Sequence, residues 1–428
     1  MIDEEKVNAK SGIDTNYIIM GAMLLVGACC TIVPAQITAI IVVGITCLLC
    51  LRGNGVLILP LLLFYYNYFG DIAGIRTFYI CAVLIVAFDI KSVLRVNKDI
   101  SLWMAVLVYF LYIICVVSSL NIKSMVYMGI SVITMLYAKK KLLSNEELLR
   151  LFFMIFGLTA VVSYFNGLFS QNIYDTVLIL AGHASNVART MGTFNDPNYM
   201  GLFYSVAVFS MVSLELFDKR VRVILVCVLY VMIATTLSIT AIIGNILFWA
   251  IYLLLTKKIN IRTFVIILIV AAVCVGAYSY GLKHTNIPYL SDLSARISDK
   301  LQNADNMDSL TTGRSGHAED HWNYYCKQNL LRMLIGGNCV NSLAIDPAID
   351  TIAAHNEYVD LLLNVGFIGT FVLVLYLGKR LVQTYLDYRY NNNDKNALCV
   401  FMIKIVYVFY AATLTIFMEN RFLLFYFL

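Results

Sequence analysis

The sequence predicts an all-α protein, a bundle of about 12 or 13 transmembrane helices with one large loop domain outside the membrane. Two observations predict this class. Hydrophobic residues make up 61% of the chain and charged residues only 13%, with a mean hydropathy of +0.80, whereas about 25% of residues are charged in an average soluble domain. Between its charge clusters the chain consists of apolar runs, many of them close to the roughly 20 residues that a helix needs to cross a bilayer.

The candidate spans follow one another through most of the chain. They cover residues 17–33, 35–51, 56–69, 75–90, 101–119, 122–138, 147–168, 198–217, 221–238, 241–256, 262–281, 356–378 and 397–417. The third and fourth spans are short, which suits tilted, broken or re-entrant segments. The stretch 421–428 is apolar but too short to cross alone.

The organisation predicted from these spans has four parts. They are a cytoplasmic tail (1–16), a helix bundle with a short outer loop (17–281, loop 169–197), a large extracytoplasmic loop with an amphipathic helix (282–355), and C-terminal transmembrane helices (356–428). With the N-terminus in the cytoplasm and sides alternating, most lysines and arginines fall in cytoplasmic connections, as the positive-inside rule requires. The short outer loops keep only Arg76, Lys123, Arg189 and Arg421. All five histidines then lie outside, so we expect the functional site there.

The composition argues against several other functions. The net charge of +5 comes from basic residues spread along the chain, not from the single basic patch that nucleic-acid binding requires. There is no GxxxxGK[ST] motif and no GxGxxG after a strand, so nothing indicates ATP-driven transport. Cys47 and Cys50 form a CxxC motif, but it lies inside an expected membrane helix and no other metal-binding residue is nearby in the sequence, so the motif does not indicate a metal or redox site. Cys326 and Cys339 could pair outside the cell, although their spacing alone does not decide it.

The first candidate region is Arg189 with the run Gly-Thr-Phe-Asn-Asp-Pro-Asn at 192–198. Pro197 marks a turn into the next span, and Asn195 or Asp196 can cap that helix by accepting its free N–H groups. This structural interpretation is the preferred one for Asp-Pro-Asn. Arg189 has two interpretations: a clamp for a pyrophosphate at the mouth of the bundle, or a side chain that reaches the lipid headgroups.

The second candidate region runs from Arg314 to Asn338. Apolar side chains recur there at helical spacing: Ala318, Trp322, Cys326, Leu330, Met333 and Leu334. This pattern predicts a helix on the outer membrane surface or on the bundle. Arg314 stands just before it, where a helix N-terminus and a guanidinium together favour a phosphate. His317 and His321 are spaced to bind a metal, but no clear third ligand is present, and a solvated helix face is the preferred interpretation.

The third candidate region, from His355 to Asp360, opens the span that ends near Gly378. Four polar residues share one helical stripe: Asn356, Glu357, Asp360 and Asn364. Polar groups in a span normally face the bundle interior or a water-filled cavity. An imidazole that titrates near neutrality could remove a proton from an attacking hydroxyl, which is the role considered for His355. The alternative is a helix-start histidine in the headgroup layer.

In this order and on this face, the three regions resemble the O-antigen ligase / Wzy polymerase family of bacterial polysaccharide assembly. The matching parts are Arg189 with 192–198, Thr312-Gly313-Arg314 with Trp322 and Gly336-Gly337, His355-Asn356-Glu357-Tyr358, and Gly366-Phe367-Ile368-Gly369. The resemblance covers about residues 186–378. The preceding part of the chain matches only as a generic set of spans.

The resemblance implies a GT-C-like membrane glycosyltransferase that uses neither a metal nor a nucleotide cofactor. Its donor would be an oligosaccharide on undecaprenyl pyrophosphate, used at the outer face of the bacterial cytoplasmic membrane. Carried over, Arg189 and Arg314 would hold the pyrophosphate and His355 would assist the acceptor hydroxyl. The expected substrate-binding residues are Asn198, Trp322, Asn356, Glu357, Tyr358 and Asp360. Membrane lipid and the flippase and chain-length regulator of the same pathway are candidate partners, and nucleic acid is not.

The sequence departs from the family pattern at one position. Family members often carry an Arg or Lys after a Ser/Thr pair at the outer end of a middle span, whereas Ser238-Ile239-Thr240 is followed here by Ala241 and Ile242. The resemblance favours a polymerase that joins repeat units of a surface polysaccharide. A ligase that passes finished glycan to another acceptor is the alternative within the family. A transporter or flippase of lipid-linked sugar is the alternative from another class, although the chain lacks repeated halves.

Overall fold

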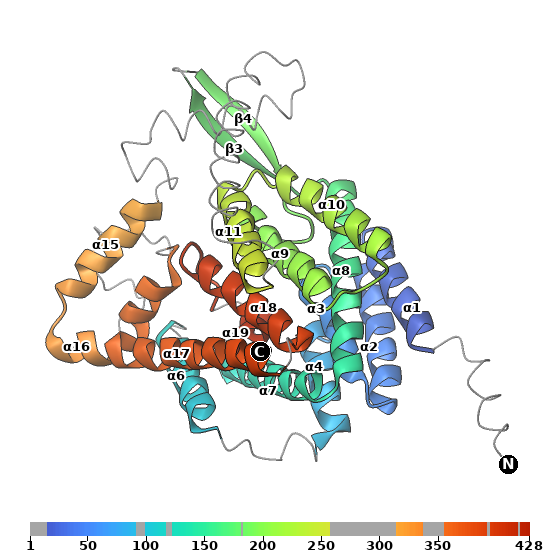
Figure 1. The fold of residues 1–428 in the computed structure, drawn as a ribbon, viewed down its shortest axis with the longest axis horizontal. Coiled ribbons are helices and arrows are strands. Elements are labelled where there is room, and N and C mark those ends of the chain that lie inside the picture. The colour runs from blue at the N-terminus through green and yellow to red at the C-terminus, as the bar shows by residue number, and fades with distance from the viewer. Residues whose placement is uncertain are drawn as a thin grey trace.

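The computed structural model describes residues 15–90, 99–116, 122–180, 183–256, 314–336, 355–391, 394–417 and 420–428. Helices dominate these residues (Figure 1), which confirms the predicted helical class. The strands among them form two antiparallel hairpins. The expected span 262–281 and much of the large outer loop lie outside the described residues.

Most helices begin and end within a few residues of the predicted spans. In the first part of the chain they are α1 (Thr15–Cys29), α2 (Ala35–Leu51), η1 (Gly55–Ile58), α3 (Leu59–Phe64), α4 (Thr77–Phe88), α6 (Ile100–Val116), α7 (Ile122–Ser144) and α8 (Glu146–Phe169). They continue with α9 (Pro197–Ser213), α10 (Lys219–Thr235), α11 (Ile239–Leu255), α15 (Arg314–Cys326), α16 (Leu330–Ile335), α17 (Glu357–Tyr390), α18 (Lys395–Ala411), η2 (Asn420–Phe422) and α19 (Leu423–Phe427). By length and composition, α8 and α17 could each cross a membrane.

Side-chain caps explain where several helices start. Asn145 accepts a hydrogen bond from the Leu148 amide at 3.0 Å at the start of α8, and Asp394 accepts one from the Asn396 amide at 2.8 Å at the start of α18. Such caps satisfy N–H groups that have no partner inside the helix. Glu146 and Glu147 add negative charge to the first turn of α8, where the helix dipole favours it.

The connection 169–197, expected as an outer loop, contains a β-hairpin that the spans did not predict. Strands β3 (Ile173–Leu180) and β4 (His183–Thr190) pair from Ile173 with Thr190 to Leu180 with His183. A second, short hairpin joins β1 (Asp71–Ile72) to β2 (Ile75–Arg76). Both strands of the long hairpin contain β-branched residues, which favour extended backbone. In Figure 1 this hairpin projects beyond α9, α10 and α11.

Charged and polar pairs tie neighbouring helix ends together at two separate ends of the bundle. At one end the ion pairs are Asp89–Lys141, Asp99–Lys379 and Glu215–Lys395, with N–O distances of 2.6, 2.7 and 2.6 Å. At the other end the hydrogen-bonded pairs are Asn67–Asn195, Tyr68–Ser170 and Lys123 with the Gly74 carbonyl. The alternation of sides predicted from lysine and arginine placement assigns the first group to the cytoplasmic side and the second group to the outer side.

Asp99, in its pair with Lys379, stays charged at neutral pH. Partial burial alone would raise the pKa of Asp99, but hydrogen bonds from Lys379 and Ser101 outweigh this effect and lower the pKa to about 2. Lys379 also donates to the Ser101 hydroxyl at 2.8 Å. This cluster therefore fixes the start of α6 against α17.

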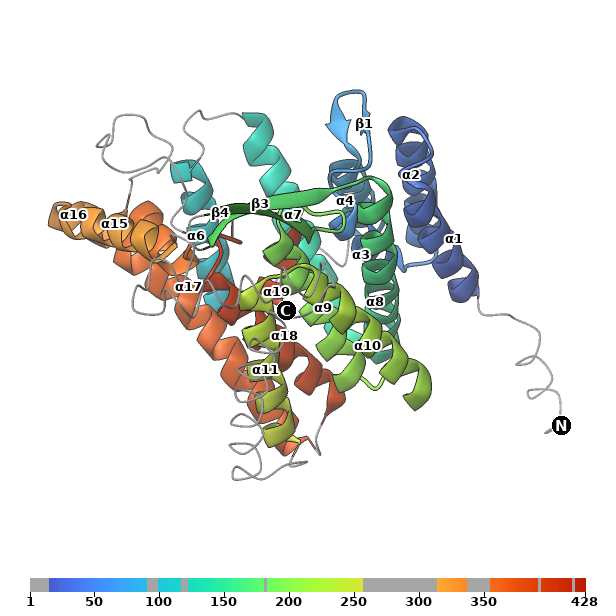
Figure 2. The ribbon, with the colours of Figure 1, turned by 90° about the horizontal axis from the view of Figure 1, so that it is seen from above.

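The apolar stretch 421–428 fills the centre of the fold, where both views show the C label (Figures 1 and 2). All of its side chains are buried. Lys404 donates to the carbonyls of Phe425, at 3.1 Å, and Tyr426, and Arg380 donates to the carbonyl of Leu428 at 2.7 Å. Carbonyls at a helix end need such donors, and positive charge is favourable there.

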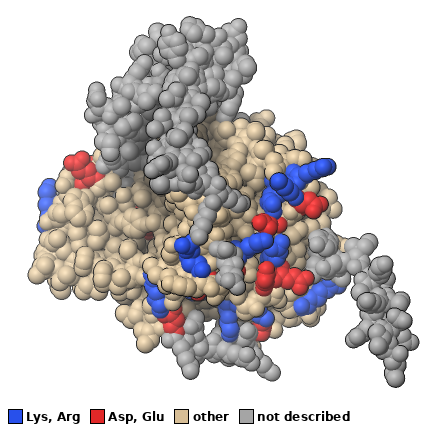
Figure 3. Space-filling view, in the orientation of Figure 1, with Lys and Arg blue, Asp and Glu red and all other residues tan. Residues whose placement is uncertain are grey.

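Several helices are apolar on their outward faces as well as on their buried faces. The exposed residues are Ile100, Trp103, Met104, Leu107 and Leu111 on α6, and Phe367, Ile368, Phe371, Val374 and Leu375 on α17. Figure 3 shows correspondingly broad areas of the described surface without charged side chains. A helix that is hydrophobic all round is typical of a protein core or a membrane span.

A pair of glycines joins α16 to a kink in α17. Gly366 has φ 66° and ψ −174° inside α17, and Gly336 has φ 75° and ψ −145° at the end of α16. A Cβ on Gly366 would lie 2.4 Å from the amide nitrogen of Gly336, and a Cβ on Gly336 would lie 2.4 Å from the carbonyl oxygen of Asn364. The two backbones can approach this closely because glycine has no Cβ atom. The backbone conformations of both residues are also nearly exclusive to glycine.

We expect Gly366→Ala to lower the free energy of unfolding by about 2 kcal/mol or more, because alanine is strained in this conformation and collides with Gly336. The measurement is the thermal unfolding midpoint of the purified protein in detergent. Gly378→Ala is a matched control on the same helix, since its added Cβ meets nothing within 4 Å. The control should be neutral or stabilise by up to about 1 kcal/mol. Equal midpoints for the two variants would contradict the glycine contact.

Candidate functional site

Arg189 lies at the end of β4 with its side chain buried, only 7% exposed. Its Nε donates to the Thr236 carbonyl at 2.8 Å, in the connection between α10 and α11. The neighbouring Thr190 and Thr235 hydroxyls are 2.7 Å apart. This burial disfavours a side chain that reaches out to headgroups. It holds the guanidinium inside the bundle, next to the connection that leads into α11.

The segment 192–198 forms the predicted turn and cap. Asp196 caps α9, because its carboxylate accepts from the amide of Asn198 at 2.6 Å and from its side chain at 2.7 Å. The Asn198 oxygen accepts from the Ser238 hydroxyl at 2.6 Å. Ser238 in turn caps α11, accepting from the Ala241 amide at 3.2 Å. Ser238 therefore joins the start of α11 to the start of α9. It belongs to the Ser-Ile-Thr run at 238–240, which lacks the Arg or Lys that often follows in the family.

At the third region the helix begins one residue later than predicted. Asn356 caps α17 by accepting from the amides of Tyr358 and Val359, at 3.1 and 3.4 Å. His355 lies before the helix with φ 50°, so helical spacing does not set the direction of its imidazole. The left-handed region is uncommon outside glycine, although histidine, asparagine and aspartate are enriched there.

The polar stripe on α17 faces the protein interior, as its spacing predicts: Glu357, Asp360 and Asn364 are all buried. One carboxylate oxygen of Glu357 accepts from the amides of Ile416 and Phe417, at 2.6 and 2.8 Å. Asp360 accepts from the Tyr112 hydroxyl at 3.0 Å. Both carboxylates are therefore tied to other parts of the chain, Glu357 to the turn after α18 and Asp360 to α6.

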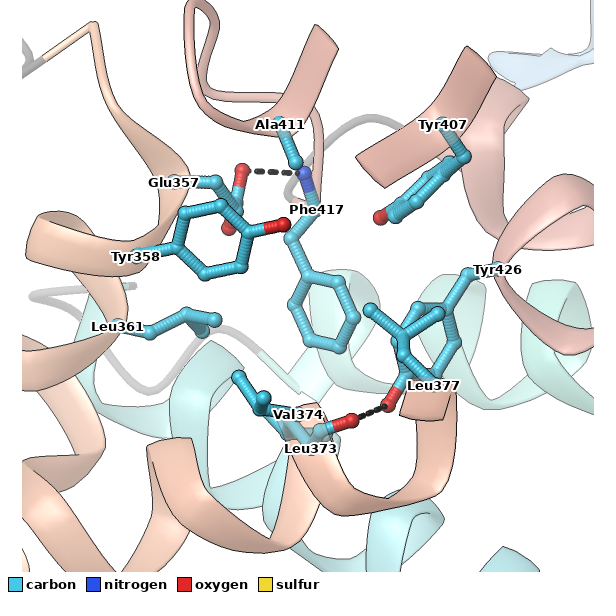
Figure 4. A pocket seen from close by; sticks show the side chains of 10 residues that line it. All are labelled: Glu357, Tyr358, Leu361, Leu373, Val374, Leu377, Tyr407, Ala411, Phe417 and Tyr426. Atoms are coloured by element: carbon cyan, nitrogen blue, oxygen red, sulfur yellow. Dashed lines mark hydrogen bonds between the residues drawn. The ribbon is translucent and has the colours of Figure 1, made fainter. Parts of the chain in front are cut away.

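Glu357 also lines a mainly apolar pocket between α17 and α18 (Figure 4). Its Oε1 atom is buried and has no hydrogen-bond partner among the described residues. Figure 4 shows Tyr358 and Tyr407 on either side of the pocket, with Phe417 between them. The Tyr358 hydroxyl donates to the Val408 carbonyl at 3.1 Å. Among the residues that line this pocket, Glu357 is the one with an acidic side chain.

A turn at 412–417, which the sequence did not indicate, connects the first region to the third. The Tyr199 hydroxyl, in the first turn of α9, donates to the Thr415 carbonyl at 3.1 Å. The next two amides, of Ile416 and Phe417, are those bound by Glu357. The starts of α9 and α17 therefore hold the same turn from two sides.

Arg421 follows this turn and is buried among aromatic rings. Its guanidinium carbon lies 5.6 Å from the ring centre of Tyr66, 5.5 Å from that of Phe194 and 5.9 Å from that of Tyr199. Guanidiniums over ring faces are stabilised by the ring quadrupole. The signal that could have found it is the polar group Glu419-Asn420-Arg421 between two apolar runs, because charges in such surroundings are costly unless they have a specific role.

The α15 helix differs from the predicted amphipathic helix. Trp322 is 47% exposed and Cys326 is exposed, whereas His321 and Tyr325 form the buried face. The helix ends at Cys326, and the Tyr325 hydroxyl donates to the Met333 carbonyl at 2.7 Å, which holds α16 against α15. Burial raises the pKa of Tyr325, and the neighbouring Cys326 adds to the shift. The face that packs against the protein is therefore made by His321 and Tyr325, and the apolar stripe with Trp322 lies on the exposed face.

α15 brings one histidine toward the third region. The rings of His317 and His355 have centres 6.4 Å apart. Arg314 is the first residue of α15, but its side chain, like Thr312 and Gly337, lies outside the described part. Glu319 and Asp320 are exposed, and no group of three metal-binding side chains occurs among the described residues. Cys339, the partner considered for Cys326, is not among them either.

The described candidate residues thus fall into two linked groups. Arg189 and Asn198 are joined through the α10–α11 connection, and Tyr199 then leads through the turn 412–417 to Glu357. His355 adjoins this second group from the α15 side. Exposed Trp322 makes an aromatic contact with Tyr325, at a ring-centre distance of 5.8 Å, within α15. No protein-family model and no curated protein sequence matches this chain.

Proposed function

We propose that the protein is a membrane glycosyltransferase that joins lipid-linked oligosaccharide repeat units into a bacterial surface polysaccharide. The observation that carries the proposal is the connection between two motifs far apart in sequence. The turn 412–417 is bound by Tyr199 next to Asn198 and by Glu357 next to His355. A buried cation at one motif can stabilise a diphosphate leaving group, and a histidine at the other can take the proton of an acceptor hydroxyl.

In the proposed reaction the acceptor hydroxyl attacks the anomeric carbon of the donor glycan. A new glycosidic C–O bond forms, and the bond from that carbon to the pyrophosphate oxygen breaks. His355 takes the hydroxyl proton, and undecaprenyl pyrophosphate leaves with the bonding electrons. Arg189 and Arg314 stabilise the negative charge that develops on the leaving group, which fixed guanidiniums can do by bidentate hydrogen bonds.

Two features support a many-spanning membrane protein with its site on the outer side. The outward faces of α6 and α17 carry large exposed apolar side chains, which suit contact with lipid tails. Helix ends that the positive-inside rule assigns to one side also contact each other, as in the pairs Asp89–Lys141 and Asn67–Asn195. The candidate residues Arg189, Asn198 and Glu357 belong to the end with the Asn67–Asn195 pair, which the positive-inside rule assigns to the outer side.

Gene deletion separates the polymerase from the ligase, which would use the same site with another acceptor. Loss of a polymerase leaves single repeat units on the cell surface, whereas loss of a ligase leaves full-length glycan on the lipid carrier. Conversion of the lipid-linked repeat unit to longer chains by the purified protein, without added metal, would support the polymerase directly. A flippase or transporter would produce no longer chains in that assay.

We expect His355→Asn to slow repeat-unit joining by roughly 100- to 10,000-fold, the range that a general base contributes. Asparagine tolerates the left-handed backbone of residue 355, so the unfolding midpoint should not change. The measurement is the rate of chain lengthening by the purified variant. His317→Asn, which removes the neighbouring imidazole on α15, is the control and should retain most activity. If the control variant loses more activity than His355→Asn, the base has been assigned to the wrong histidine.

A further inference from the structure

The short helix α16 presents apolar side chains outward. None of its residues is buried, and Leu330, Leu331 and Ile335 are 72%, 66% and 58% exposed. Lys327, three residues before α16, and Arg332, within it, are also exposed. Large apolar side chains that gather on a surface mark a binding face. A partner for this face must accept leucine and isoleucine together with adjacent positive charge.

The position of α16 beside α17 indicates what that partner is. The Gly336 backbone packs against Asn364 and Gly366 at the kink, and directly after the kink α17 exposes Phe367 and Ile368. The apolar face of α16 is therefore continuous with the outward face of a helix long and apolar enough to span a bilayer. Figures 1 and 2 both show α15 and α16 at one edge of the molecule, next to α17.

We infer that α16 is a membrane anchor that lies in the same leaflet as the kink of α17. Leu330, Leu331 and Ile335 insert among the acyl chains, and Lys327 and Arg332 contact anionic headgroups, as in helices that lie in a membrane interface. The hydrogen bond from Tyr325 to Met333 couples this anchor to α15. Lipid contact at α16 therefore holds His317 near His355.

This inference rests on the membrane insertion proposed above, and depth-dependent fluorescence quenching tests the two separately. Tryptophan is introduced in the full-length protein at Leu331 on α16, at Phe367 on α17, and at exposed Asn323 on α15. Each variant is reconstituted into vesicles that contain lipids brominated near the headgroup or deep in the acyl chain. The wild-type signal from its own three tryptophans is subtracted.

We expect added quenching for Leu331→Trp and Phe367→Trp, strongest for Leu331→Trp with bromine near the headgroup, and none for Asn323→Trp. Quenching of Phe367→Trp without quenching of Leu331→Trp overturns the anchor and leaves the membrane span intact. If neither residue is quenched, the proposed membrane insertion fails as well. Lys327→Glu together with Arg332→Glu should reduce quenching at Leu331→Trp in vesicles rich in anionic lipid. Unchanged quenching there would remove the headgroup contact from the inference.

Discussion

Arg189→Ala should lower the rate of repeat-unit joining by roughly 100- to 1,000-fold, the loss seen when one fixed donor to a developing negative charge is removed. The side chain is buried and tied to the Thr236 carbonyl, so its charge is held in place before the donor binds. Arg189→Lys should fall between alanine and the wild type, because an ammonium keeps the charge but lacks the planar fork that matches a phosphate. The measurement is chain lengthening by each purified variant at saturating lipid-linked donor.

A structural role for Arg189 predicts a different result, and Thr190→Val distinguishes the two. Thr190 bonds to Thr235 at 2.7 Å beside the Arg189–Thr236 contact, so valine removes a neutral hydrogen bond from the same connection. We expect a loss of about 1 kcal/mol in the free energy of unfolding, with the rate per folded molecule retained. If Arg189→Ala lowers activity only in proportion to its loss of stability, Arg189 ties the hairpin to the bundle and does not act on the donor.

Features set by neighbouring residues in sequence could be predicted. Asp196 caps α9 as expected, because a capping carboxylate acts on amides within two or three residues of itself. The buried stripe that contains Glu357 and Asp360 follows in the same way from helical spacing. The ends of α2 agree with the predicted span 35–51 because Pro34 stands before this mainly apolar run and Arg52-Gly53 follow it.

Features that depend on distant contacts could not be predicted. The stretch 421–428 is too short to cross a membrane alone, but its residues do not show that it lies at the centre of the bundle, because the donors to its carbonyls, Lys404, Arg380 and Tyr376, come from distant parts of the chain. The turn 412–417 has no motif of its own, because its partners are Tyr199 and Glu357. The role of Ser238 likewise appears only when α9 and α11 are placed side by side.

The β-hairpin and the buried face of α15 were missed for a different reason. Residues 173–190 contain apolar and β-branched side chains, as strands do. They lie between two long apolar runs that were expected to be spans, so the sequence predicts only a loop there. On α15 the sequence predicts that the stripe with Trp322 faces the membrane surface or the bundle and that His317 and His321 lie on a solvated face, whereas His321 is buried against the protein. A histidine or tyrosine can cover apolar surface with its ring while its polar atom finds a partner, as Tyr325 does with Met333.

Glu357→Ala should reduce the free energy of unfolding by roughly 2–4 kcal/mol, because the amides of Ile416 and Phe417 lose their shared acceptor in a buried site. The turn 412–417 would then keep its hydrogen bond from Tyr199 on the α9 side and lose both of its hydrogen bonds to α17. We therefore expect a large loss of activity together with a lower unfolding midpoint. Asn166→Ala is a stability control, since it removes a buried side chain that bonds to Tyr65 and the Gly27 carbonyl outside the site.

Glu357→Gln separates positioning of the turn from proton transfer. Both amides bond to the same carboxylate oxygen, so the glutamine carbonyl can accept both, and its NH₂ group takes the place of the unpartnered Oε1. If Glu357 only positions the turn, the variant should keep its unfolding midpoint and remain within about tenfold of the wild-type rate, since the glutamine carbonyl keeps both hydrogen bonds to the turn. If Glu357 itself accepts the acceptor's proton, the folded variant should lose the roughly 100- to 10,000-fold that a general base supplies, and His355→Asn should be the milder change. The geometry favours the first outcome, because the carboxylate is already committed to the turn that joins the starts of α9 and α17.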